Sequence, residues 1–169
     1  MTGTFLSHHV SESSKAALVE DLLVATGRAQ IRAFGVSMLP CLWPGDVLTI
    51  QSAHTADLSV GEILIVKQND GWVAHRIAAS SATQLITRGD SVPENDPPIH
   101  LGYVIGKVVS VTRGSKEFVP KRLSRPQRCL AWLLCHFGPF RNLMLNLHRA
   151  RETRIYSEVS SKFKPTTAS

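Results

Sequence analysis

Residues 62–77 read EILIVKQNDGWVAHRI, and this stretch decides the fold of the chain. An apolar run at 63–66 is followed by Asn69-Asp70-Gly71 and then by a second run in which apolar residues alternate with other residues. An Asn-Asp-Gly turn between two such runs is a strong signal for a β-hairpin. We therefore predict two antiparallel strands, at 62–66 and 71–77, joined by a tight turn.

Short strands of the same kind are predicted on both sides of this hairpin. They cover residues 30–34, 47–50, 84–88 and 104–111, and a helix at 13–26 precedes them. Strands at this spacing, with Gly and Asp turns, indicate an antiparallel β domain that is partly closed. The predicted fold class is mainly β: a small coiled antiparallel sheet or partly closed barrel with short N- and C-terminal helices.

The composition of the 169 residues divides the chain into three segments. We predict an N-terminal helical segment at 1–29, a β domain at 30–119, and a basic amphipathic helical extension with a disordered tail at 120–169. Of the net charge of +6, most of the excess lies beyond Pro120, where only Glu152 and Glu158 oppose many Lys and Arg residues. Such a segment favours an anionic membrane surface or nucleic acid as a partner.

The basic extension is predicted to be helical from 128 to 151, with an interruption at Gly138-Pro139. Trp132 and Phe137 make it amphipathic, which suits a helix lying in a membrane interface as well as a helix packed on the β domain. A membrane-spanning helix needs roughly 20 apolar residues, and no stretch of the chain supplies them cleanly. The N-terminus has no basic start followed by an apolar run, so no signal peptide is predicted.

The three cysteines, Cys41, Cys129 and Cys135, show no metal-binding spacing, and their number is odd. We therefore predict reduced thiols and neither a metal nor another cofactor.

The stretch FGVSMLP at 34–40 places Ser37 in a turn between glycine and proline. A serine hydroxyl becomes a useful nucleophile only beside a base, and the base usually needs an orienting partner. His75 is the best candidate base, although a histidine on the apolar face of a strand is often a core residue. Asp90 and Asp96 follow the predicted strand at 84–88, where either could simply cap a turn.

In chain order, these features form a series of short motifs. Gly-x-Ser-Met-x-Pro is followed by Pro-Gly-Asp, Gly-Glu-Ile-Leu-Ile-Val, His-Arg-Ile, Thr-Arg-Gly-Asp with a second Asp six residues on, and Val-Ile-Gly-Lys-Val. From about Arg32 to Val109 the chain resembles the signal peptidase I family of serine endopeptidases, within the wider group that includes the LexA-type peptidases. Since His75 stands where many relatives have lysine, it resembles the archaeal and endoplasmic-reticulum branch, which uses Ser, His and Asp.

This resemblance implies that Ser37 is the nucleophile and His75 the general base. Asp96 best matches the orienting acid of the family and Asp90 the other acidic position, but which of them touches His75 stays open. The resemblance implies a precursor protein or leader peptide as the partner, and no nucleic acid is expected. The charge of the basic extension adds a membrane surface as a possible second partner. The expected location is membrane-associated, peripherally or through a C-terminal anchor, with the cytoplasm as the alternative.

Three features depart from the family pattern. Many relatives have a serine two residues before the nucleophile, where this chain has Gly35. The third motif reads Gly61-Glu62 rather than Gly-Asp, and the usual N-terminal membrane anchor is missing. Two other functions therefore stay open: a LexA-type regulator that cleaves itself, and a non-catalytic β module that binds peptides or a membrane.

Overall fold

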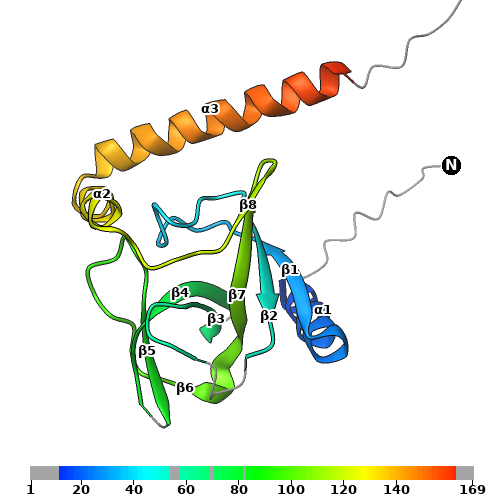
Figure 1. The fold of residues 1–169 in the computed structure, drawn as a ribbon, viewed down its shortest axis with the longest axis vertical. Helices are drawn as coiled ribbons and strands as arrows, with labels where there is room; N and C mark the ends of the chain where they lie inside the picture. Colours follow the sequence, from blue (N-terminus) through cyan, green and yellow to red (C-terminus); the bar gives the residue numbers. More distant parts are fainter. Residues whose placement is uncertain (1–11, 54–57, 69–70, 82, 163–169) are drawn as a thin grey trace, which may run out of the picture.

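The computed structural model describes residues 12–53, 58–68, 71–81 and 83–162, and it contains one antiparallel sheet with helices at both ends (Figure 1). The strands are β1 (Arg28–Arg32), β2 (Val47–Gln51), β3 (Ile63–Gln68), β4 (Gly71–Ser80), β5 (Gln84–Arg88), β6 (Ile99–His100), β7 (Val104–Arg113) and β8 (Lys116–Phe118). The helices are α1 (Glu12–Thr26), α2 (Arg125–His136), α3 (Gly138–Lys162) and the short 3-10 helix η2 (Leu101–Tyr103).

The strand order is β1-β2-β7-β3-β4-β5-β6, and β8 pairs with β7 outside this path. β3 and β4 form the predicted hairpin, with Leu64 opposite His75 in the register. Residues 69 and 70 of its turn lie outside the described residues. The first four residues of β3, Ile63–Val66, are all buried because β3 lies between β7 and β4 and has a core on each face.

The alternation of the strands divides the core into two clusters. Ile63 and Ile65 pack with residues of β2, α1 and the loop after Ser37. Leu64 and Val66 pack on the opposite face with Ile77 and Leu85. Because successive side chains of a strand point to opposite faces, the single run in β3 supplies both clusters.

Two parts of the predicted fold class need correction. The described sheet stays open rather than closing into a barrel, because β1 and the two-residue β6 lie at opposite ends of the strand order and do not pair. The protein is also a mixed α and β structure rather than a mainly β one, since α3 alone has 25 residues. The predicted antiparallel arrangement is confirmed.

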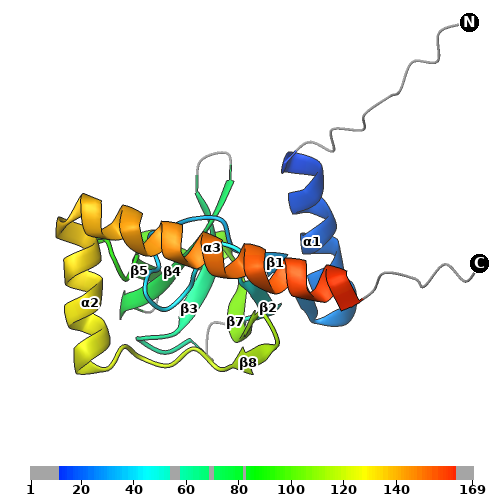
Figure 2. The same ribbon diagram turned by 90° about the horizontal axis from the view of Figure 1, so that it is seen from above.

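The C-terminal extension folds into two helices that meet near Gly138, close to the predicted interruption. Ser124 and Gln127 form a capping box at the start of α2, which satisfies backbone donors that would otherwise lack partners. α3 runs above the end of the sheet that holds the β7–β8 hairpin (Figure 1) and crosses the strands when the protein is seen from above (Figure 2). It ends at Lys162, beyond residue 151, where the predicted helix ended, and residues 163–169 of the predicted disordered tail lie outside the described part.

The three cysteines differ in exposure, and they should therefore differ in reactivity. All are free; Cys41 is buried, Cys135 is half-buried and Cys129 is exposed. Burial raises the pKa of the Cys41 thiol, which lowers its thiolate fraction near neutral pH. We expect a short maleimide pulse to modify Cys129 first and Cys41 last, as read by peptide mass spectrometry. Labelling of Cys41 in the folded protein as fast as that of Cys129 would contradict this prediction.

Candidate active site

The loop between β1 and β2 holds Ser37 at the surface because its neighbours are anchored in the core. Met38, Leu39 and Leu42 are buried, and the Leu42 N–H donates a hydrogen bond to the Met38 carbonyl at 2.9 Å. The Asp46 carboxylate closes the loop by accepting from the Trp43 N–H and from Arg113. Apolar residues that face inward on one side of the turn thus leave Ser37 half-buried on the other.

β4 brings His75 to this serine. Nε2 of His75 lies 3.1 Å from Oγ of Ser37, within the reach that proton transfer requires. His75 and Ile77 are both buried, as expected for residues on one face of a strand. The ring is therefore held by its strand rather than by a mobile loop, and it is only 7% exposed.

Asp96 completes the chain of hydrogen bonds. Its Oδ2 lies 2.6 Å from Nδ1 of His75 and accepts a hydrogen bond from the Thr87 hydroxyl, also at 2.6 Å. The Asp96 N–H donates to the Thr87 carbonyl at 2.8 Å, so the loop after β5 returns to the end of that strand. A carboxylate on Nδ1 favours the tautomer that leaves Nε2 free to accept the serine proton.

Asp90 lies elsewhere and does not contact His75. Its two carboxylate oxygens accept hydrogen bonds from Nε and Nη2 of Arg76, each at 2.8 Å. Arg76 also donates to the Gly61 and Lys121 carbonyls. Burial opposes the charge of Arg76, but the Asp90 carboxylate outweighs this effect and raises the guanidinium pKa above its usual value. Asp90 therefore belongs to a buried ion pair that joins β4 to the loop after β5.

The same loop supports the backbone of the nucleophile. The Ser91 N–H donates to the Ser37 carbonyl at 2.9 Å, and the Ser91 hydroxyl donates to the Val36 carbonyl at 2.8 Å. A Cβ added at Gly89 would lie 2.7 Å from the Ser37 carbonyl oxygen and 3.0 Å from its Cβ. Because no side chain fits at such distances, only glycine lets the two loops approach this closely.

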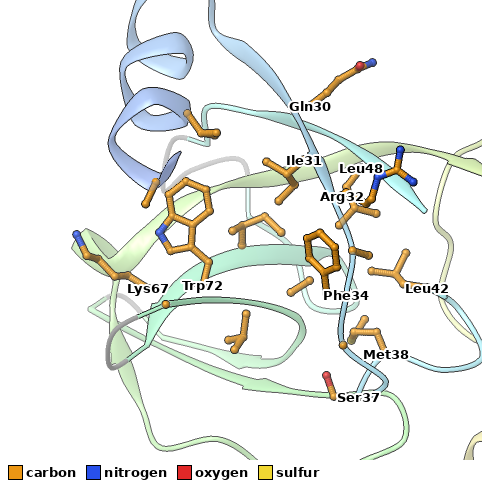
Figure 3. Close-up of a pocket in the computed structure, with 18 of the residues that line it drawn as sticks. Gln30, Ile31, Arg32, Phe34, Ser37, Met38, Leu42, Leu48, Lys67 and Trp72 are labelled. Atoms are coloured by element: carbon orange, nitrogen blue, oxygen red, sulfur yellow. The ribbon is translucent and has the colours of Figure 1, made fainter. Parts of the chain in front are cut away.

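An apolar groove of about 770 Å³ runs from Ser37 toward α1. Figure 3 shows Ser37 near one side of it, with Trp72 and Lys67 nearer to the helix. The side chains that line it come from β1 and the residues after it, from β4 and from α1; they include Ile31, Ala33, Trp72, Ala74, Ala16 and Val19.

Two strand edges that have no strand partner among the described residues border this groove. β1 is the first strand of the sheet, and β5 pairs with β4 only from Arg76 onward. The Ala33 N–H is bonded toward β2 and the Ile77 N–H toward β3. The N–H and C=O groups of successive residues point alternately to the two edges of a strand. The backbone groups of Arg32 and Phe34 therefore point to the open edge beside β1, and those of Trp72 and Ala74 point to the open edge of β4.

No model of a known protein family, no curated protein and no solved structure matches the chain. The described residues also contain no group of three His, Cys, Asp or Glu side chains that could hold a metal ion.

The structure therefore brings together three of the four predicted site residues and separates the fourth. Ser37, His75 and Asp96 form one hydrogen-bonded chain, whereas Asp90 pairs with Arg76. The sequence reasoning missed Thr87 and Ser91 as supporting residues. Both lie within or beside the Thr-Arg-Gly-Asp motif, but a hydroxyl in a strand or a turn carries no signal of what it will contact.

Proposed function

We propose that the protein is a serine endopeptidase that cleaves signal or leader peptides from precursor proteins. The observation that carries the proposal is the hydrogen-bonded chain from Ser37 through His75 to Asp96 at 3.1 and 2.6 Å. This arrangement of nucleophile, base and orienting acid recurs in serine hydrolases of unrelated folds. The sequence resemblance to the signal peptidase I family supports the same reaction.

In this mechanism Oγ of Ser37 attacks the carbonyl carbon of the scissile bond, and Nε2 of His75 takes the serine proton. The resulting imidazolium gives that proton to the leaving amine, and water then hydrolyses the acyl-enzyme by the same route. Asp96 stays ionised and stabilises the imidazolium through Nδ1. The backbone N–H of Ser37 is the proposed oxyanion donor, and one such donor contributes about 3 kcal/mol.

The groove supports an extended peptide as the substrate rather than a small ester. A peptide placed between β1 and the first half of β4 would pair with the outward backbone groups of both edges, as an added strand does. Its side chains would meet apolar walls that lead to Ser37. Backbone pairing binds many sequences, so selectivity would come from the side chains near the cut.

The test combines a covalent probe with a search for substrates. A fluorophosphonate should label Ser37, and the pure protein should cleave members of a mixed peptide library at a restricted set of bonds, both read by mass spectrometry. Ser37→Ala should lose both activities, while Asp21→Asn on the exposed side of α1 should keep them.

Three outcomes would overturn the proposal. Equal library cleavage by the Ser37→Ala protein would assign the activity to a contaminant. Absence of both labelling and cleavage in the folded protein would leave a non-catalytic β module as the better description. Cleavage of the chain itself, with none of the library, would favour the self-cleaving alternative.

A further inference from the structure

We propose that α2 and the first half of α3 form a docking surface for an anionic lipid bilayer. The surface, called the arm face below, consists of exposed apolar residues and the cationic residues that flank them: Trp132, Phe137, Leu143, Leu147, Arg125 and Arg128. Its evidence is independent of the proposed peptidase chemistry.

The two faces of α2 have opposite characters. Ala131 and Leu134 are buried against the body of the protein. On the other side, Arg125, Arg128 and Trp132 are exposed and follow one another at intervals of three and four residues, which places them on one stripe of the helix. An aromatic ring is thus presented to the surroundings beside two guanidinium groups.

The apolar surface continues around the corner into α3. The large side chains of Trp132, Phe137, Leu143 and Leu147 are each more than half exposed. Trp132 and Phe137 also line an entirely apolar hollow at the corner, together with Leu133, Pro139 and Phe140. Phe140, Leu143 and Leu147 follow one another at intervals of three and four residues, which places them on one stripe of α3 that starts at this hollow. Single exposed apolar residues are normal on proteins, but a group of them on one surface marks an interaction site.

Charge identifies the partner of this face. Between Glu117 and Glu152 the chain has seven Lys and Arg residues and no Asp or Glu. A second copy of the same face would repel it, since both would be cationic. An anionic bilayer can bind both the cationic and the apolar residues of the arm face. Its headgroups attract the cations, and its interface accepts Trp, Phe and Leu side chains.

The mode of binding follows from the helices. No helix in the described part of the chain is long and apolar enough to cross a membrane. A basic amphipathic helix instead lies in the plane of the interface, with its apolar side below the headgroups. We therefore infer peripheral binding, with α2 and the first half of α3 lying along the bilayer.

α3 contacts the loop that carries Ser37. A membrane bound to the arm face would therefore lie close to the groove. Nε2 of His148 on α3 lies 3.1 Å from the Pro44 carbonyl oxygen, and its ring packs on Trp43 with centroids 4.7 Å apart. Met144 and Leu145 on α3 are half-buried, while Leu143 and Leu147 are exposed. One side of α3 thus faces the body and another remains available.

The test is flotation of the full chain with vesicles of phosphatidylcholine alone or with about one quarter phosphatidylglycerol. A cation near such a surface contributes about a fivefold gain in partitioning, so Arg125→Gln with Arg128→Gln should lower it roughly 30-fold on the anionic vesicles. Trp132→Ala with Phe137→Ala should lower it by about 10-fold or more, because apolar area no longer leaves water. Neutral vesicles should bind the unmodified chain only weakly.

Matched control variants distinguish the effect of the arm face from the effect of removing exposed cationic or apolar residues elsewhere. Arg28→Gln with Arg88→Gln removes two exposed cations from the sheet, and Leu18→Ala with Val24→Ala removes two exposed apolar residues from α1. Both should float like the unmodified chain. Trp132→Phe should also float, but it should lose most of the shift to shorter wavelength that Trp fluorescence shows on vesicle binding.

The proposal is overturned if the unmodified chain does not float with anionic vesicles at low salt. It is also overturned if the control double variants lower flotation as much as the double variants of the arm face do. Binding to duplex DNA without flotation would assign the basic arm to nucleic acid instead. Ser37→Ala should float normally, so failure of the peptidase proposal and failure of this one give different results.

Discussion

Replacement of His75 by alanine is expected to lower kcat for the best library peptide by about 10⁶-fold, to the level of Ser37→Ala. Nε2 of the ring lies 3.1 Å from Oγ, and a serine hydroxyl is a poor nucleophile without a base beside it. The Ser37→Ala, His75→Ala double variant should be no slower than either single variant, because the residues act as a unit. Single-turnover assays with excess enzyme would measure these rates.

Asp96→Asn tests the other half of the chain of hydrogen bonds. An amide can donate its N–H to Nδ1 and so favour the wrong tautomer, and we expect a loss of about 10⁴-fold in kcat. Thr87 already donates to the Asp96 oxygen that contacts His75, so it helps to hold the side chain in place. Asp21→Asn serves as the matched carboxylate control. Retention of more than a tenth of kcat by His75→Ala would contradict the proposed role of His75.

The strands of the central hairpin could be predicted because their residue pattern is strongly periodic. Ile63–Val66 and the alternation around His75 required no knowledge of distant partners. β6 and β8, with two and three residues, are too short to produce such a pattern. The openness of the sheet was not predictable either, since closure depends on whether β1 meets a distant strand edge.

The division of roles between Asp90 and Asp96 also lay beyond the sequence. Both carboxylates follow β5, and their partners, Arg76 and His75, are neighbours on β4. Because neighbouring side chains of a strand point to opposite faces, the two partners lead to different sides of the sheet. The backbone bond from Asp96 to Thr87 decides which carboxylate reaches the histidine, and local sequence does not specify such a contact.

Asp90→Ala should produce the largest loss of stability, about 3–5 kcal/mol in the free energy of unfolding. The side chains of Arg76 and Asp90 are only 12% and 4% exposed, so the variant leaves a buried guanidinium without its carboxylate. Its bonds to the Gly61 and Lys121 carbonyls offer dipoles but no opposite charge. For a chain of this length the melting temperature should fall by roughly 10 °C, as measured by circular dichroism or calorimetry.

A second variant distinguishes the cost of an unpaired charge from a loss of packing. Replacing both partners, as Arg76→Met with Asp90→Leu, removes the buried charges together and should recover much of the stability lost in Asp90→Ala. Asp96→Asn should stay within about 1 kcal/mol of the unmodified protein, because its amide can still pair with Thr87 and His75. If Asp96→Asn destabilised the fold as much as Asp90→Ala, the assignment of Asp90 to the framework and Asp96 to the reaction would be wrong.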